Sequence, residues 1–256
     1  MPIAPPEKVF DFLIRSHNAL QPLSERLSFD KGYPLHRNLI ALNGSIIELT
    51  GAVIVLVDHR RITGVPVLLR SILEAYVDLH NLIETPTYGY VLELGHIKEW
   101  LKILQEARAG KNEYLAAIAE APDLDDRIAE WTKRKDVLEN KGHRSLRIEQ
   151  KFHRAGMEKE YKSQYNSLCC DAHNNLRALV DRHIEMNGTG FEVVYYKAYT
   201  PEDSAVHVGT NAELLIRATQ KIHEFFKSPV AGEVAQLRHE LDVLRGEAQG
   251  GIGHAA

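Results

Sequence analysis

Residues 64–84 read GVPVLLRSILEAYVDLHNLIE, which is the most strongly apolar helical stretch of the chain. Apolar residues recur at every third or fourth position, and this spacing predicts a helix with a wide buried face. Arg70 and Glu74 lie one helical turn apart in the middle of the stretch. A buried helix keeps two opposite charges where they form an internal ion pair or belong to a site. The stretch therefore predicts a helical core with a polar centre.

Long helices are also predicted on both sides of this stretch. The segment from about residue 35 to residue 61 is apolar, and only a short link around Thr63 separates it from residues 64–84. So short a link between two long helices predicts an antiparallel hairpin. Further helices are predicted at seven other places along the chain. They are residues 8–23 with a break or kink at Pro22, 88–110, two shorter segments within 111–142, 145–152, 157–186, 210–227 and a segment near 234–244.

The run FEVVYYKAY, residues 191–199, is the only β-like segment, because it is rich in β-branched and aromatic residues. It predicts a lone strand or a short hairpin. We therefore predict an all-α fold in which residues 1–228 form one helical bundle domain. Residues 229–256 follow as an appendage that consists of an amphipathic helix and a flexible, glycine-rich tail.

The composition is that of an ordinary globular protein, with 44% hydrophobic and 26% charged residues among 256. A formal net charge of −4 provides no general basic field for nucleic acid, although a local basic patch is compatible with it.

The first residues lack a basic segment followed by an apolar one, and no uninterrupted run of 18 apolar residues follows, so neither secretion nor a membrane span is expected. The adjacent Cys169 and Cys170 cannot readily pair with each other, which predicts reduced thiols and a cytoplasmic location.

A polar stripe is predicted on the helix that begins near residue 157. Five residues follow one another at steps of four: Tyr161, Tyr165, Cys169, His173 and Arg177. On a helix these positions share one face. Each of these residues alone is more often an ordinary packed residue, but burying several polar groups costs stability unless they bond to one another or to partners. The candidate partners are Arg70, Glu74 and Glu48, and small residues around Glu48 predict that it lies near a packed seam.

Two segments, ITGVPVLLRSILEAYVDLHNLIE at residues 62–84 and YKSQYNSLCCDAH at 161–173, resemble a family of bacterial helical proteins classed as a domain of unknown function. That family has an Arg-Ser-x-x-Glu helix and a distal helix with Tyr-x-x-Leu-Ser-x-x-x-His. The matching residues here are Gly64, Arg70, Ser71, Glu74, Tyr161, Tyr165, Leu168 and His173. Cys169 stands where the family has serine, which puts in doubt any role that needs a hydroxyl group there. The resemblance spans roughly residues 35–180 and implies no chemistry.

A more distant resemblance is to the HEPN-like helical bundles, many of which are metal-independent ribonucleases or partners of nucleotidyltransferases. Their signature is an arginine, four to six residues and a histidine on a helix that pairs with its copy across a dimer. Arg177 and His183 match this spacing, and so do Arg217 and His223. Chance also produces such matches, and the competing interpretation of residues 177–183 is a solvated basic helix end that suits the helix dipole.

Metal and cofactor chemistry is not predicted. Glu93 and His96 form a single Glu-x-x-His motif, whereas ferritin-like metal bundles need two such motifs and further carboxylates. The sequence has no paired-cysteine or His-Glu-x-x-His zinc motif and no glycine-rich phosphate loop. Cys169 with His173 as its base is conceivable because residues four apart adjoin on a helix, but no oxyanion donors can be identified for it.

Two functional hypotheses follow from these residues. The first is a HEPN-like cytoplasmic protein that acts on RNA or a nucleotide in stress or phage defence. Its candidate catalytic residues are His173, Arg177, His183 and Glu74, and its candidate ligand-binding residues are Arg70, Tyr165, Tyr161 and Glu48. The second is a non-enzymatic helical dimer or adaptor whose polar cluster only fixes packing. Both allow a homo-oligomer, and neither involves a membrane. The test is whether Arg70 and Glu74 meet Tyr165 and His173 where water reaches them.

Overall fold

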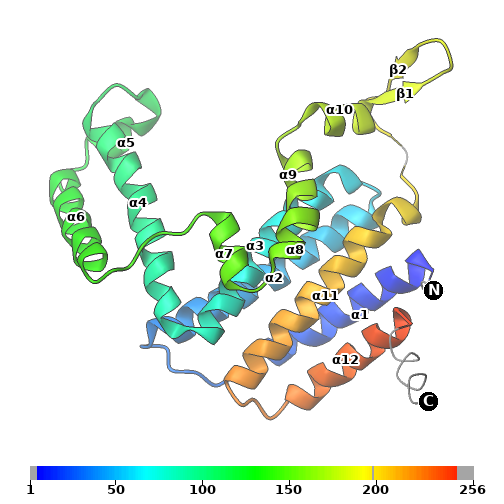
Figure 1. The fold of residues 1–256 in the computed structure, drawn as a ribbon, viewed down its shortest axis with the longest axis horizontal. Coiled ribbons are helices and arrows are strands. Elements are labelled where there is room, and N and C mark those ends of the chain that lie inside the picture. Colours follow the sequence, from blue (N-terminus) through cyan, green and yellow to red (C-terminus); the bar gives the residue numbers. More distant parts are fainter. Residues whose placement is uncertain (1–4, 198, 247–256) are drawn as a thin grey trace. The chain divides into compact units, whose positions relative to one another are not determined.

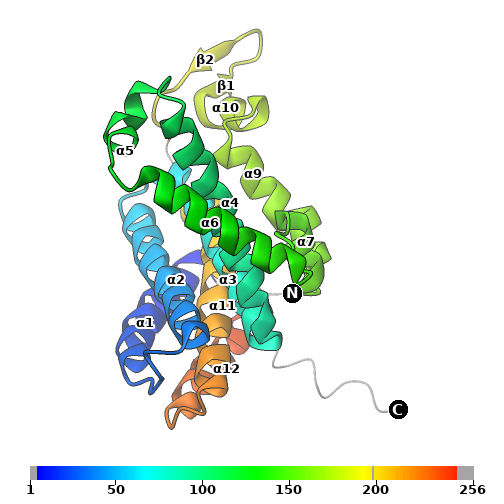
Figure 2. The same cartoon turned by 90° about the vertical axis from the view of Figure 1, so that its left-hand side faces the viewer.

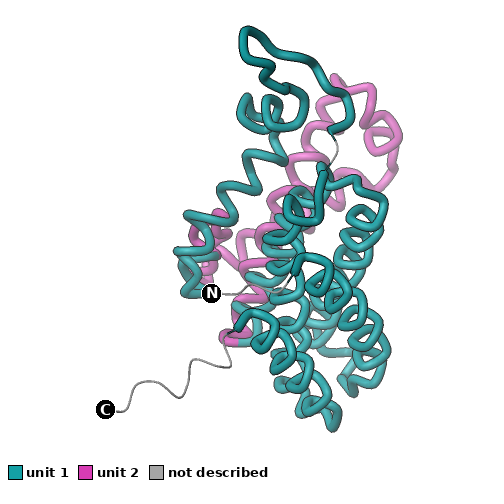
Figure 3. The backbone as a smooth tube through the Cα atoms, turned by 90° about the vertical axis from the view of Figure 1, so that its right-hand side faces the viewer, with its two compact units in different colours: residues 1–83, 152–256 teal, residues 84–151 magenta. Residues whose placement is uncertain are grey.

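The computed structural model describes residues 5–197 and 199–246 of the chain. The chain divides into two compact units, which Figure 3 colours separately. Unit 1 contains residues 1–83 and 152–256, and unit 2 contains residues 84–151. Within the described residues the regular elements are helices, apart from one two-stranded sheet. The predicted all-α class is therefore confirmed.

Unit 1 is built around long helices that pack side by side (Figure 1, Figure 2). They are α1 (Pro6–Glu25), α2 (Pro34–Asp58), α3 (Val65–Glu84), α11 (Pro201–Phe225) and α12 (Ala231–Leu244). Their apolar faces meet in a core where Phe12, Ile46 and Leu215 are fully buried. α1 continues through Pro22 to Glu25, so this proline does not end the helix.

Two local details explain where the helices of unit 1 begin. α11 starts at Pro201 rather than near residue 210, because Thr200 and Asp203 form a capping box and proline is well accommodated in the first turn. A single-turn helix, η1 (Ile62–Gly64), links α2 to α3. A Cβ atom on Gly64 would lie 2.9 Å from Leu56 Cδ1, so a larger residue in this link would require the Leu56 side chain to move.

α2 is the one helix among the described residues that is long and apolar enough to cross a membrane by length and composition. A core helix of a soluble protein passes the same test. In unit 1, α2 packs against α1 and α11 and buries Leu39, Ile46 and Val53.

The prediction of one long helix over residues 157–186 is wrong. The segment contains α8 (Glu158–Glu160), a π-helical turn η4 (Tyr161–Tyr165), α9 (Asn166–Ala172) and α10 (Leu176–His183). The break between α9 and α10 falls at Asn174, which has a φ of 49°, a left-handed conformation that asparagine tolerates. Asn175 then caps α10 by accepting a hydrogen bond from the backbone N–H of Ala178.

A short hairpin follows α10. β1 (Ile184–Met186) pairs antiparallel with β2 (Phe191–Val193). This confirms the predicted β-like segment as a hairpin, although the strand covers only the first part of residues 191–199 and residue 198 lies outside the described residues. The predicted flexible tail at residues 247–256 also lies outside them.

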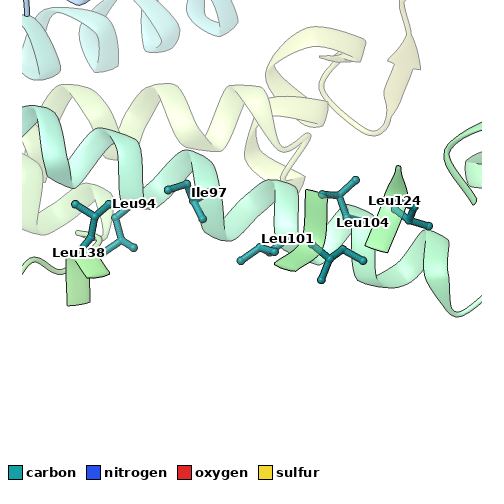
Figure 4. Close-up of a cluster of buried hydrophobic side chains, with 7 residues drawn as sticks. Leu94, Ile97, Leu101, Leu104, Leu124 and Leu138 are labelled. Carbon is teal, nitrogen blue, oxygen red and sulfur yellow. The ribbon is translucent and has the colours of Figure 1, made fainter. Parts of the chain in front are cut away.

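Unit 2 has an apolar core of its own. Its helices are η2 (Pro86–Tyr88), α4 (Gly89–Arg108), η3 (Glu113–Leu115), α5 (Ala116–Ala119) and α6 (Leu124–Asn140), and α7 (Ile148–Arg154) continues from unit 2 into unit 1. α4 packs against α6 through Leu94, Ile97, Leu101, Leu104, Leu124, Ile128 and Leu138 (Figure 4). The two shorter helices predicted within residues 111–142 are confirmed.

Candidate functional site

Four polar side chains meet in unit 1, and we call them the Arg70 cluster: Arg70, Glu74, Tyr165 and His173. Arg70 Nε donates a hydrogen bond to Glu74 Oε1 at 3.0 Å. The Tyr165 hydroxyl donates to the same carboxylate oxygen at 2.7 Å and accepts from Arg70 Nε at 3.3 Å. His173 Nε2 lies 3.0 Å from Arg70 Nη1. The charged pair on α3 therefore meets Tyr165 and His173, as the sequence predicts.

The Arg70 cluster is buried at one end and open to water at the other. Tyr165 is only 3% exposed, whereas the side chains of Arg70 and Glu74 are 25% and 37% exposed. His173 is exposed at the end of α9. The Arg70 guanidinium also lies over the Tyr165 ring, with its central carbon 5.4 Å from the ring centroid. Water and a ligand can therefore approach Arg70 from the His173 side.

The contact between Arg70 and His173 defines the hydrogen-bonding role of one imidazole nitrogen. A guanidinium only donates hydrogen bonds, so His173 Nε2 must accept one through its lone pair. This lone pair is used by Arg70 as long as the contact lasts.

Tyr165 is held in its protonated form. Burial raises the pKa of the Tyr165 hydroxyl well above its ordinary value, and the hydrogen bond to the Glu74 carboxylate raises it further, while Arg70 opposes the shift. The hydroxyl therefore stays a donor to Glu74. Tyr165 and Glu74 together hold the Nε side of the Arg70 guanidinium in a fixed orientation.

The π-helical turn η4 ends at Tyr165 and contributes it to the cluster. The Tyr165 ring stacks on Tyr161, with centroids 5.5 Å apart, and packs against the buried Phe152 at 5.0 Å. A π turn holds one residue more than an α turn, which changes the direction of the side chains on either side of it. Such turns are frequent at functional sites. The turn η4 was not predicted from the sequence, because the regular spacing of the polar stripe is also that of an uninterrupted α-helix.

Two other candidates from the sequence lie near or outside the cluster. Tyr161 is half-buried beside Tyr165 and contributes ring packing. Glu48 lies exposed on α2, so its predicted position at a packed seam is wrong. The buried residues of α2 include Asn43, Ile46 and Thr50, and Glu48 is on the opposite side of the helix.

The candidates on α10 are separate from the cluster. Arg177 is 79% exposed and lies 3.6 Å from Asp181 one turn later. His183 Nδ1 is 3.0 Å from the backbone oxygen of Val194, which follows β2. Because the chain breaks at Asn174, neither residue continues the stripe that ends at His173. Cys169 is half-buried on α9, and both it and Cys170 are free thiols.

A cavity of about 230 Å³ borders the same π turn and was not predicted from the sequence. Its lining includes Leu73 of α3, Glu160 and Gln164 around η4, Arg217 of α11, and Arg245. Glu213 also lines it, and Arg245 and Arg238 both donate hydrogen bonds to this carboxylate. The Glu213 carboxylate in the cavity wall is thus already paired with arginines, and no regular spacing in the sequence brings these residues together.

The Glu-x-x-His motif of unit 2 is used in packing. Arg134 of α6 donates two hydrogen bonds to the Glu93 carboxylate at 2.6 and 2.9 Å. The ring of His96 packs against Trp131 with centroids 5.4 Å apart. In residues 5–197 and 199–246, no three histidine, cysteine or acidic side chains are grouped so that they could hold a metal ion.

Comparison with known proteins gives one match. A family model described as a family of unknown function (DUF5677) matches residues 36–191. This range contains α3 and η4 to α10, and therefore all four residues of the Arg70 cluster. No curated protein and no solved structure matches the chain.

Proposed function

We propose that this chain, which belongs to the family of unknown function DUF5677, binds the phosphate group of RNA or of a nucleotide at the Arg70 cluster. In this proposal Arg70 binds the phosphate and His173 is the acid–base residue. The observation that supports it is the 3.0 Å contact between Arg70 Nη1 and His173 Nε2 at the water-exposed end of the cluster. A guanidinium that binds phosphate oxygens beside an imidazole that transfers a proton is a suitable pair for phosphate chemistry.

Phosphate binding would change the state of His173. A phosphate oxygen carries negative charge and accepts hydrogen bonds from a guanidinium more strongly than a neutral imidazole does. A bound phosphate would therefore take over Arg70 Nη1 and release the lone pair of His173 Nε2. The freed nitrogen could then accept a proton from an attacking hydroxyl group. The base would become available only when the ligand is bound.

Glu74 and Tyr165 act as positioning residues in this proposal. Both bond to the Nε side of Arg70, which leaves its Nη groups directed toward the open end of the cluster. A guanidinium that is already oriented loses less freedom when it binds a phosphate.

The HEPN-like form of the proposal uses Arg177 and His183 as the catalytic pair. Its support is their spacing and the exposure of Arg177, which lies on the helix that follows His173 and can reach an RNA phosphate. A role in stress or phage defence belongs to this form. We place the activity in the cytoplasm because Cys169 and Cys170 are free thiols.

A structural adaptor is the second candidate function, and one observation favours it. Arg70 Nε, Glu74 Oε1 and the buried Tyr165 hydroxyl satisfy one another. Such a cluster can serve only to fix how η4 and α9 pack on α3. The adaptor predicts that replacing Arg70 destabilises the fold and that no ligand binds.

The two functions are separated by binding and cleavage measurements on folded variants. Fluorescence anisotropy with labelled single-stranded RNA and calorimetry with nucleotides measure binding, and gel assays measure RNA cleavage. Arg70→Lys keeps the positive charge but loses the planar guanidinium, which can donate two parallel N–H groups to a phosphate. We therefore expect binding to weaken at least about tenfold. His173→Ala should leave binding nearly intact and lower turnover by about 10²–10⁴.

The control variant is His59→Ala, because His59 is an exposed histidine outside the cluster. It should change neither binding nor turnover. Arg177→Ala tests the HEPN-like form and should lower turnover only if that form is right. Unchanged activity in a folded Arg70→Lys variant would exclude the Arg70 cluster as the site. If the wild-type chain binds neither RNA nor nucleotides while Arg70→Ala destabilises it, the adaptor is the better description.

A further inference from the structure

The cavity beside η4 lies within unit 1, among α3, α8, η4 and α11. Its volume of about 230 Å³ is below the roughly 300–1,000 Å³ of pockets that take drug-sized molecules, so it suits a small metabolite. Part of its lining is apolar and comes from Leu73, Met157 and Leu214. The charged part includes Glu160 and Arg217. The cavity therefore offers a ligand an apolar wall and charges of both signs.

Two other charged residues of the lining, Glu213 and Arg245, are already bonded to each other. Arg245 Nη1 donates to Glu213 Oε2 at 2.7 Å, and Arg238 Nη1 donates to Glu213 Oε1 at 2.5 Å. Arg245 Nη2 also donates to the backbone oxygen of Gly209 at 3.1 Å. Because both carboxylate oxygens of Glu213 have an arginine donor, this carboxylate is neutralised. Of the charged residues that line the cavity, Glu160 and Arg217 remain for a ligand.

Arg217 of α11 is held in place and still has N–H groups to offer. Its guanidinium lies over the ring of the buried Tyr76, with the central carbon 5.3 Å from the ring centroid. Its Nε atom is 3.7 Å from Glu213 Oε1, which is too far for a hydrogen bond. The Arg217 side chain is 40% exposed, so a ligand can reach it from water. A positioned guanidinium of this kind can bind a carboxylate through two parallel hydrogen bonds.

Glu160 brings a negative charge to the same cavity from another element. It is the last residue of α8, is half-buried, and directly precedes η4. It forms no ion pair or hydrogen bond with any other residue that the structure describes. A half-buried carboxylate without a partner favours a bound cation, and an ammonium group would also donate hydrogen bonds to it. Glu160 and Arg217 thus line one cavity without bonding to each other.

We propose that this cavity binds a small aliphatic amino acid, which carries one carboxylate, one ammonium group and an apolar chain. Arg217 binds the carboxylate, Glu160 binds the ammonium group, and Leu73, Met157 and Leu214 contact the chain. A simple anion is rejected because Glu160 repels it, and a simple amine is rejected because Arg217 repels it. The proposal does not depend on the proposed phosphate site.

The bound amino acid would also stabilise the π turn. Glu160 directly precedes η4, and Gln164, which also lines the cavity, lies within the turn. A ligand that bonds to both Glu160 and Arg217 links the start of η4 to α11. Since a ligand stabilises the state that binds it, local opening of the turn becomes rarer. We therefore expect slower amide hydrogen exchange over residues 158–165 when the cavity is occupied.

Two-dimensional NMR titrations of the full chain measure this binding. The probes are L-leucine and ε-aminocaproate, which differ in the distance between their two charged groups. We expect at least one of them to bind with a dissociation constant of about 1 mM or less and to shift amides of residues 157–164 and 210–217. Isocaproate lacks the ammonium group and isoamylamine lacks the carboxylate. Each should bind at least about tenfold more weakly than the better amino acid.

Two charge-removing variants test the two contacts separately. Glu160→Gln and Arg217→Gln should each weaken binding of the amino acid at least about tenfold. The controls are Glu158→Gln, 46% exposed on the same helix as Glu160, and Arg15→Gln, 62% exposed on α1; neither residue lines the cavity. Both should bind as wild type does, and far-UV circular dichroism confirms that each variant is folded.

Three results would overturn the proposal. The first is the absence of saturable shifts with either amino acid up to about 10 mM. The second is a single-charge analogue that binds as tightly as the better amino acid. The third is unchanged affinity in folded Glu160→Gln and Arg217→Gln variants.

Discussion

At the residue scale, Arg70 links the buried and exposed ends of its cluster. Its Nε bonds to Glu74 and Tyr165, and its Nη1 contacts His173. Because a guanidinium donates through several nitrogens in one plane, fixing Nε also fixes the direction of the Nη groups. The protonated Tyr165 therefore acts on His173 through Arg70, although the two residues share no hydrogen bond in this network.

The four residues of the Arg70 cluster could be predicted from the sequence. The sequence did not show that Glu48 lies outside the cluster. Arg70 and Glu74 are one turn apart, and Tyr165 and His173 are two turns apart on the polar stripe, so helical spacing alone groups each pair. The contact between α3 and α9 depends on tertiary packing, and the sequence suggested it only because a buried polar stripe needs partners. Glu48 was misplaced because, although the nearby Gly51 lies against His17 of α1, Glu48 itself is on the exposed side of α2.

His223 should make the folding stability depend on pH. It is fully buried on α11, and neither ring nitrogen has a hydrogen-bond partner among the described residues. Burial lowers the pKa of His223, and Arg26 lowers it further, while Glu233 opposes this shift. As pH falls below about 6.5, the unfolded chain therefore binds a proton that the folded chain does not, and the free energy of unfolding decreases.

Urea denaturation at a series of pH values measures this effect. One histidine can contribute at most about 1.4 kcal/mol per pH unit, in the sense that stability falls as the solution becomes more acidic. His223→Leu should remove this contribution, whereas His59→Leu, at an exposed position, should not. The free energy of unfolding of His223→Leu should still depend on pH to some extent, because burial also lowers the pKa of His207. Equal pH slopes for wild type and His223→Leu would contradict the prediction.

At the element scale, the segment from Glu158 to His183 shows where helical periodicity misleads. Steps of four residues from Tyr161 to Arg177 predict one helix, but the chain forms a π turn and then breaks at Asn174. The stacked rings of Tyr161 and Tyr165 and the tilted ring of Phe152 pack together at the π turn, which is a tertiary effect. The Asn174-Asn175 pair is the local signal for the break, because asparagine suits both a left-handed residue and a helix cap.

Arg182 should hold the turn between α9 and α10. Its side chain is only 11% exposed and donates to Asn174 Oδ1 at 2.9 Å and to the backbone oxygen of Asp171 at 2.8 Å. Arg182→Ala leaves these acceptors without their charged donor, at a cost of about 1–3 kcal/mol. We expect faster amide hydrogen exchange over residues 174–183 and unchanged exchange in α11. Arg177→Ala removes an exposed arginine of the same helix and is the control; similar exchange in both variants would refute the role of Arg182.

At the scale of the whole molecule, the chain has two compact units, and unit 2 is inserted between two parts of unit 1. No linker or change of composition marks the boundaries, since residue 84 ends α3 and residue 151 lies within α7. The sequence could therefore predict the helices and the all-α class but had no local signal for this division. Compact units need not unfold separately, so the single bundle domain over residues 1–228 stays a prediction.

Leu104→Ala should show whether unit 2 unfolds by itself. Leu104 is fully buried in the α4–α6 core, and truncating such a leucine costs about 2–5 kcal/mol. If unit 2 is a separate cooperative unit, amides in α4 and α6 should lose protection from hydrogen exchange while those in α1 and α11 keep theirs. Ile103→Ala is the matched control, because the neighbouring Ile103 is 38% exposed and its truncation leaves no comparable cavity. Loss of protection in both units to the same extent would mean that the chain unfolds as one domain, as the sequence predicts.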